Sequence, residues 1–400
     1  MLNIKNKGNI TFINYKQILF SLPSQLIAIV IISFAFGNFV PEVVKAFFLS
    51  ISLSIKNMLI FILPFIIFSF SFYSFARLKT GLITYTVLLL SMMCVSNFMA
   101  VITSYYASIV TRNIISVELA NVSNQTIMLE SLFELTLPKF FSNVNGLILG
   151  ILLGIYTSTQ NKNKLLQLAK NLNNTSNKFL NNIFIPILPI FILGFILKFQ
   201  HTGTLNSIFK NFMPLLLVLI ALYCLYIGTA YLITMSFNIK RTIVAIQNII
   251  PAAIIGFSTM SSAAALPLLT SGAMKNSKDH ELTQSIIPSI TNTHMLGDAL
   301  GIPLMALSLY VVQYHNMPEF SAYITFAISY VLAKFAAAGI PGGTIIVMIP
   351  VLESSLQFTP EMSGIILMMY ILFDPFCTIF NIFGNGLFPI IFEKIWQRLK

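Results

Sequence analysis

The chain has 400 residues, of which 56% are hydrophobic and 9% are charged, and its formal net charge is +11. Because soluble globular domains carry about 25% charged residues, this composition excludes a soluble globule and indicates a polytopic membrane protein. The basic residues lie between apolar segments, so their charge sets membrane orientation and forms no basic stripe that would bind nucleic acid.

Apolar stretches long enough to cross a bilayer, which takes about 20 residues, recur along the chain. We expect eight spanning helices, near residues 17–37, 44–74, 81–110, 143–157, 179–198, 211–236, 285–312 and 362–390. Two further apolar segments, near 243–274 and 321–356, are interrupted by small and polar residues. We expect each of them to enter the membrane and return to the same side.

The distribution of lysine and arginine supports this count, because these residues are enriched in cytoplasmic loops. With eight spans, the basic segments at 5–16, 77–79, 162–178, 240–241 and 394–400 all fall on one side. Both termini are therefore expected in the cytoplasm. The first interrupted segment then enters from the cytoplasm and the second from outside, as an inverted pair.

The two interruptions point to a binding site. An irregular backbone at membrane depth persists only where it is buried in protein or lines a cavity, and paired breaks in two halves of a chain mark the site of a transporter. The residues at the two tips are Ser261, Ser262, Ile340, Pro341, Gly342 and Gly343. Backbone N–H groups at a broken helix suit a substrate carboxylate. The alternatives are that the small residues only permit close helix packing and that the second tip is a hinge.

Four motifs follow one another in the C-terminal half: Gly256–Pro267, Thr291–His294, Ala338–Gly343 and Asp374–Asn385. Together they resemble the dicarboxylate/amino acid:cation symporter family, the glutamate transporter homologues, and the N-terminal half resembles it in hydropathy alone. The resemblance implies an all-α fold of eight spans and two re-entrant helical hairpins in inverted repeats. It also implies a homotrimer that moves its transport domain like an elevator.

The same resemblance divides the chain into two parts. Residues 1–80 and 111–200 would form the scaffold, and residues 81–110 and 201–400 would form the transport domain.

Asp374 is a carboxylate in the middle of an apolar span, which is costly in a bilayer and marks a functional site. The alternative is a structural pair with Lys334. The resemblance implies that Asp374 holds the α-amino group of an amino acid, with Thr378 and Asn381 as further contacts. Cys377 stands where members that take acidic substrates carry an arginine, and a thiol cannot form that bidentate ion pair. A small neutral amino acid is therefore expected ahead of acidic amino acids and dicarboxylates.

The cation sites implied by the resemblance have lost their negative charge. Two aspartates of the family are replaced by His294 and Asn385, while the neutral Asn292 and Asn381 remain. Lys334 stands where oxygen ligands of a further cation are implied, just before the second tip.

Two explanations for these replacements compete. In the first, protons replace sodium: His294 titrates near neutral pH, and Asp298, four residues later, would lie on the same face of one helix. In the second, Lys334 and a protonated His294 are built-in counter-charges of an uncoupled exchanger or facilitator. A third possibility is that His294 is a hydrogen-bonded core histidine. We favour protons over sodium.

The sequence thus predicts a secondary active transporter, a symporter, in a bacterial inner membrane. No enzyme activity, cofactor or metal centre is expected, apart from Na⁺ or H⁺ as coupling ion. A channel is the alternative from another class, although no filter motif occurs. An intramembrane protease is disfavoured because Met295 replaces the first glycine of the aspartyl signature, and Gly256–Thr259 lacks the closing glycine of the serine signature.

Overall fold

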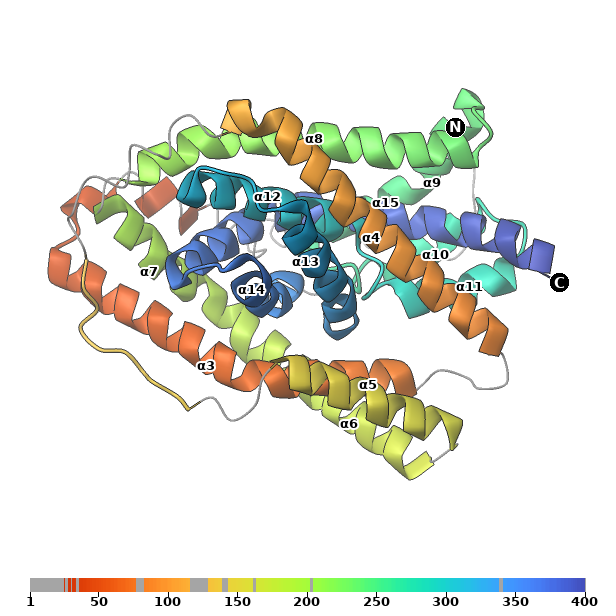
Figure 1. Cartoon of the computed structure of the whole chain (residues 1–400), viewed down its shortest axis with the longest axis horizontal. Helices are drawn as coiled ribbons and strands as arrows, with labels where there is room; N and C mark the ends of the chain where they lie inside the picture. The colour runs from red at the N-terminus through yellow and green to blue at the C-terminus, as the bar shows by residue number, and fades with distance from the viewer. Residues whose placement is uncertain are drawn as a thin grey trace, which may run out of the picture.

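The structure is a computed structural model of the chain, shown in Figure 1. It describes residues 25, 28–29, 31–33, 36–76, 83–115, 129–138, 143–160, 163–201, 204–337 and 341–399. Within these residues the fold is all-helical and contains no strand. Most of the first expected span, near 17–37, and Ile340 of the second tip lie outside the described residues.

The described helices follow one another from Gly37 to Leu399. They are η1 (Gly37–Phe39), α3 (Glu42–Ala76), α4 (Ile83–Ile115), α5 (Asn143–Thr159), α6 (Asn163–Phe179), η4 (Leu180–Phe184), α7 (Ile185–His201), α8 (Thr204–Thr234), α9 (Ile239–Thr259), α10 (Leu266–Met274), α11 (His280–Ile290), α12 (Leu296–Tyr314), α13 (Phe320–Ala333), η5 (Lys334–Ala336), α14 (Gly343–Leu356) and α15 (Pro360–Leu399).

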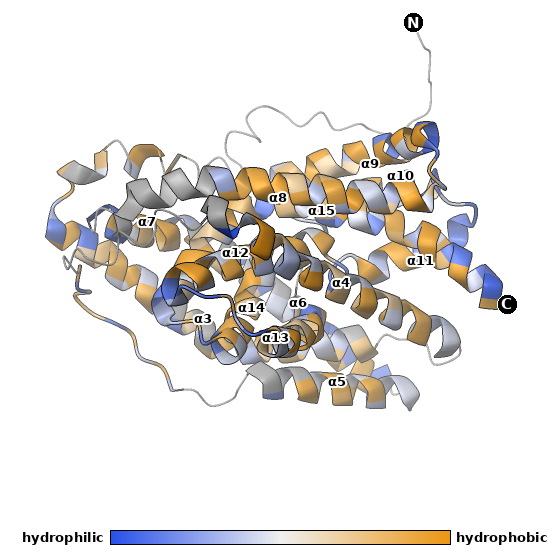
Figure 2. Cartoon of the chain, turned by 45° about the horizontal axis from the view of Figure 1, so that its top comes forward, coloured by the Kyte–Doolittle hydropathy of each residue, from blue (hydrophilic) through white to orange (hydrophobic). Residues whose placement is uncertain are grey.

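Among the described residues, five helices are long and apolar enough to cross a membrane. The qualifying stretches are Thr84–Arg112, Pro214–Thr234, Ile239–Thr259, Leu296–Tyr314 and Pro360–Leu399. Figure 2 shows apolar residues over the outer surfaces of α8 and α9, and Leu217, Leu225 and Ile233 of α8 are among the exposed side chains. Large exposed apolar surfaces of this kind indicate contact with lipid.

Two groups of helices can be followed in Figure 1. In one group α3 packs against α5, α6 and α7. In the other, α12 and α15 lie at the centre and contact each other, and α4, α8, α9 and α14 pack around them. Helix α12 is buried from Leu296 to Leu309, because neighbouring helices cover it on every side. The centre of the molecule is thus built from the two helices that carry Asp298 and Asp374.

The two predicted interruptions occur where the sequence places them. Helix α9 ends at Thr259, Met260 adopts a left-handed conformation with φ of 52°, and α10 begins at Leu266. In the second segment, α13 and η5 end at Ala336, and Gly342, with φ of 69°, caps the start of α14. The helices of each pair contact each other.

The expected span near 285–312 is divided. Helix α11 ends at Ile290, and α12 begins at Leu296, so residues 291–295 are not helical. His294 therefore lies in the break, whereas Asp298 lies in the first turn of α12. The prediction that both side chains share one helix face is wrong, because the helix is interrupted between α11 and α12.

Candidate substrate and cation site

Three buried charged side chains meet where the second interruption faces α12 and α15. Asp298 belongs to α12, Lys334 to η5 and Asp374 to α15, and their exposed fractions are 1%, 0% and 2%. Charges removed from water this completely are stable only when paired and hydrogen-bonded. The hydrogen bonds of each group therefore define the site.

The Asp374 carboxylate accepts hydrogen bonds from the tip and from its own helix. The backbone N–H of Gly342 donates to Oδ2 at 2.8 Å, and the Thr378 hydroxyl donates to Oδ1 at 3.1 Å. The predicted tip residue Gly342 and the predicted residues Asp374 and Thr378 are thus in direct contact. Pro341 and Gly343 are buried beside them.

The ammonium of Lys334 pairs with Asp298, at 3.4 Å from Nζ to Oδ2. The same ammonium lies 3.3 Å from the carbonyl oxygen of Met295 and 5.4 Å from the centre of the Tyr330 ring. The Thr344 hydroxyl also donates to Oδ2 of Asp298, at 2.6 Å. The sequence left open that Lys334 pairs with Asp374. In the structure its ammonium pairs with Asp298 instead.

Tyr370 links the two carboxylates. Its hydroxyl lies 3.0 Å from Oδ1 of Asp298 and 3.3 Å from Oδ1 of Asp374. Tyr370, Tyr330 and Thr344 were not among the site residues predicted from the sequence. None of the three has a sequence signal of its own, because tyrosine and threonine inside apolar helices are common.

Cys377 is fully buried and faces a different neighbour. Its sulfur lies 3.1 Å from the hydroxyl of Tyr223 on α8, and that hydroxyl donates to the carbonyl oxygen of Gly297 at 2.8 Å. A Cβ atom at Gly301 would lie 3.2 Å from the same sulfur. Cys377 therefore packs between α8 and α12, and Tyr223 is a neighbour that the sequence did not indicate.

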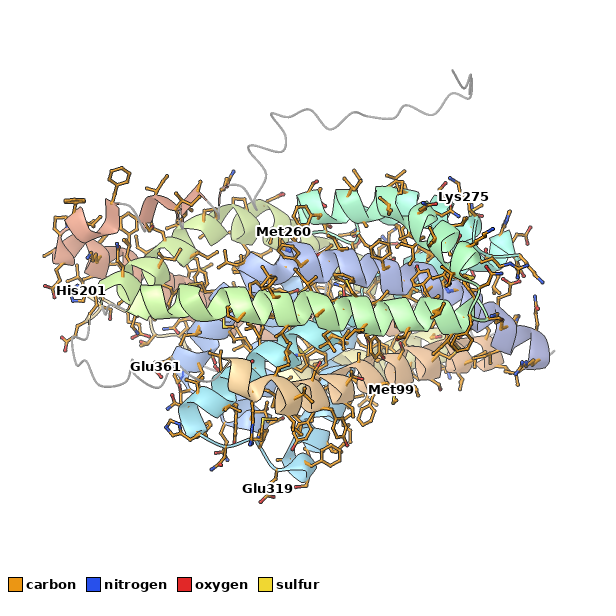
Figure 3. All side chains as sticks on the ribbon, turned by 90° about the horizontal axis from the view of Figure 1, so that it is seen from above. Met99, His201, Met260, Lys275, Glu319 and Glu361 are labelled. Carbon is orange, nitrogen blue, oxygen red and sulfur yellow. The ribbon has the colours of Figure 1, made fainter. Side chains whose placement is uncertain are left out.

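The serines of the first interruption lie in the turn after α9. The Ser261 hydroxyl accepts a hydrogen bond from the backbone N–H of Ala264 at 3.2 Å, and Ser262 is buried. Figure 3 shows that this turn, marked by Met260, lies toward the middle of the molecule, whereas Lys275 beyond α10 lies at one end. Upstream, α9 packs closely on α15, since a Cβ atom at Gly256 would collide with Ile382.

His294 is held between α4 and α15 by two neutral partners. Its Nδ1 lies 2.9 Å from Oδ1 of Asn385, and its Nε2 lies 2.9 Å from the hydroxyl of Ser96. The ring also lies against Phe388, with 4.7 Å between ring centres. These contacts match the expectation of a hydrogen-bonded core histidine.

The remaining predicted cation residues lie around the break. The side-chain oxygen of Asn381 accepts a hydrogen bond from the backbone N–H of Asp298 at 3.1 Å. Asn97, which the sequence did not indicate, donates to the carbonyl oxygen of Thr293 at 2.9 Å. Asn292 is exposed. Asn385 therefore contacts the non-helical segment through His294, and Asn381 contacts the first turn of α12.

Curated relatives match a part of the chain. Excitatory amino acid transporter 5 of Homo sapiens is 30% identical over 160 residues, which are 40% of this chain and 28% of that protein. Excitatory amino acid transporter 1 of Ambystoma tigrinum is 31% identical over 157 residues, or 39% of this chain and 28% of that protein. The chain thus matches less than a third of the length of these relatives.

A match to a protein family covers much more of the chain. Residues 22–395 match the sodium:dicarboxylate symporter family. This match confirms the resemblance inferred from the four C-terminal motifs, and the apolar helices agree with an integral membrane protein. The chain belongs to the sodium:dicarboxylate symporter family.

Proposed function

We propose that this protein is a secondary carrier of a small neutral amino acid. The observation that carries the proposal is the buried Asp374 carboxylate, which faces the broken backbone at Gly342. A carboxylate at this depth is the natural partner of a substrate ammonium group. The matched relatives are, by their names, amino acid transporters.

The substrate would lie between the two tips. Its ammonium group would bind Asp374, and its carboxylate would bind backbone N–H groups near Ser261 and Ser262, where the start of α10 adds a positive dipole end. Thr378 adjoins Asp374 and would support the same end of the ligand. Asn381 would support the site indirectly, because its side-chain oxygen accepts a hydrogen bond from the backbone N–H of Asp298 in the first turn of α12.

A neutral substrate side chain follows from Cys377. A thiol offers no bidentate partner for a second carboxylate, and this thiol already packs against Tyr223. A dicarboxylate or acidic amino acid would therefore bring a buried charge without a partner, which costs several kcal/mol. We propose on this basis that neutral amino acids are preferred.

We further propose the architecture implied by the resemblance. Eight spans and two re-entrant hairpins in inverted repeats would form a homotrimer in the bacterial inner membrane, with both termini cytoplasmic. Residues 81–110 and 201–400 would move as the transport domain against a scaffold of residues 1–80 and 111–200. The packing of α3 against α5, α6 and α7 supports this division.

The coupling ion is proposed to be the proton. The family's description names sodium, which prefers oxygen ligands and negative charge. In this chain Lys334 neutralises the buried carboxylate of Asp298. His294 occupies a position where the resemblance implied an aspartate that binds the cation. The Lys334–Asp298 pair also favours a second candidate, an uncoupled amino acid exchanger with a built-in counter-charge.

Uptake into proteoliposomes tests the substrate. Vesicles preloaded with unlabelled alanine, serine, glycine, aspartate or succinate are offered the same labelled compound. A carrier of neutral amino acids gives saturable counterflow with the first three and little with the last two. Best uptake of aspartate or succinate would contradict the argument from Cys377, and flux that does not saturate would indicate a channel.

A further inference from the structure

We propose that Asp374 holds a proton whenever the amino group of the substrate is absent, so that proton and amino group alternate at one carboxylate. The inference rests on the proposed binding of an amino acid at Asp374. It assigns the proton site to the cluster of Asp298, Lys334, Tyr370 and Asp374. His294, whose ring nitrogens have neutral partners, does not carry this proton.

The charges of the cluster give the first argument. Among the described residues it holds two carboxylates, Asp298 and Asp374, and one ammonium, Lys334. The ammonium neutralises Asp298, with which it makes its ion pair. An uncompensated buried charge costs several kcal/mol, so Asp374 needs one more positive charge. A substrate ammonium supplies that charge in the loaded carrier, and a proton supplies it in the empty one.

The hydrogen atoms of the cluster give an independent argument. A tyrosine hydroxyl has one hydrogen, yet the Tyr370 oxygen lies within hydrogen-bond distance of Oδ1 of both Asp298 and Asp374. Both contacts become hydrogen bonds when Tyr370 donates to Asp298 and a protonated Asp374 donates to Tyr370. Oδ2 of Asp374 remains free to accept from Gly342. Without the extra proton, one carboxylate oxygen would face a lone pair.

Other titratable side chains belong to this cluster or contact its helices. They are Asp298 on α12, Lys334 on η5, Tyr330 on α13, Tyr223 on α8, and Tyr370 and Cys377 on α15. Free tyrosine and cysteine side chains lose their protons above about pH 8, and Asp298 has the Lys334 ammonium as its counter-charge. Asp374 is therefore the group in this cluster that gains and loses a proton.

The exchange is balanced in atoms and charge. When the ammonium group of the amino acid reaches Asp374, the O–H bond of the carboxyl breaks, the proton passes to water, and the carboxylate pairs with the ammonium. The backbone N–H of Gly342 shares the same carboxyl group, so the tip must adjust as the ligand enters. During transport the proton then occupies the empty carrier and moves opposite to the amino acid.

Isothermal titration calorimetry of the purified full-length protein tests this exchange. Alanine, serine and glycine are each titrated in two buffers of different ionisation enthalpy, from about pH 5 to pH 8. None of these ligands changes its own charge in that range. We expect up to one proton released per amino acid bound. Where release is complete, affinity should fall about tenfold for each pH unit of acidification.

Two variants test the charge count. Asp298→Asn leaves one carboxylate and one ammonium, so the proton released on binding should be lost. Asp298→Asn combined with Lys334→Met restores an uncompensated Asp374, so the released proton should return. The double variant is the matched control, because it keeps the same change at residue 298.

The outcomes separate the two proposals. Binding without proton release in the intact protein, or with proton uptake, overturns the inference and leaves the amino acid carrier standing. Absence of binding by every neutral amino acid overturns the proposed function and the inference with it. If the variants do not bind any amino acid, the number of protons that the unaltered protein releases on binding decides whether the inference holds.

Discussion

Lys334 is the most unusual residue of the site, because a fully buried ammonium group in a membrane protein requires a partner. Asp298 supplies that partner at 3.4 Å, and the carbonyl oxygen of Met295 adds a second acceptor at 3.3 Å. Thr344 and Tyr370 donate to the same carboxylate. The pair therefore fixes the charge of the site and joins α12, η5, α14 and α15.

Removing one partner of this ion pair should cost more than removing both. Lys334→Met leaves the Asp298 carboxylate buried without its counter-charge, and breaking such a pair destabilises a protein by about 3–5 kcal/mol. The double variant Lys334→Met/Asp298→Asn leaves no unpaired charge and should recover most of that loss. Thermal unfolding of the purified variants in detergent measures both effects.

The ion-pair assignment fails if the stability losses of the two single variants, Lys334→Met and Asp298→Asn, add up in the double variant. Additive losses would mean that the two side chains do not interact, since the effects of substitutions at independent sites add and those at coupled sites do not. A double variant clearly more stable than Lys334→Met alone is the expected result.

At the scale of elements, residues of the helices before and after the second tip hold it against the core. Lys334 lies near the end of the helices before the tip and Thr344 near the start of the helix after it, and both contact Asp298. Between them, Gly342 donates to Asp374 with a left-handed backbone. The position of this tip thus depends on contacts with two different helices of the core.

Gly342→Ala should loosen the contacts that hold the second tip. A residue with a Cβ atom pays about 1–2 kcal/mol in the left-handed region, so local opening should become about 5- to 30-fold more frequent. Hydrogen exchange of the amides in residues 342–346 measures this opening. Gly343→Ala is the matched control, because Gly343 is the first helical residue of α14 and alanine favours helix.

Equal acceleration of exchange in both variants would show that the added methyl group, and not the left-handed φ, opens the tip. Unchanged exchange in Gly342→Ala would show that the backbone conformation of residue 342 does not limit local opening of the tip.

The sequence predicted where the helices are interrupted but not which side chains meet there. The interruptions at Ser261 and Gly342 were predictable because small and polar residues stand out within apolar segments, and the structure confirms both breaks. The pairing of Lys334 with Asp298 was not predictable, because it depends on how η5 crosses α12. His294 and Asp298 were misplaced because four-residue spacing implies a shared face only when the helix is continuous.

For the whole molecule, the arrangement concentrates polar chemistry in a core enclosed by apolar helices. Asp298 and Asp374 lie on the two central helices, and α4, α8 and α9 cover them with lipid-facing surfaces. The family assignment from the C-terminal motifs was possible because those motifs line this core. The N-terminal helices offered only hydropathy, since lipid-facing packing tolerates many apolar residues.

Concentrative uptake under imposed gradients tests the central claim most directly. Proteoliposomes are given a proton gradient with an acidic lumen at symmetrical sodium, or an inward sodium gradient at symmetrical pH, and uptake of labelled alanine, serine or glycine is followed. The account predicts accumulation against a concentration gradient with the acidic lumen and none with sodium alone. Accumulation driven by sodium and indifferent to the proton gradient would contradict it.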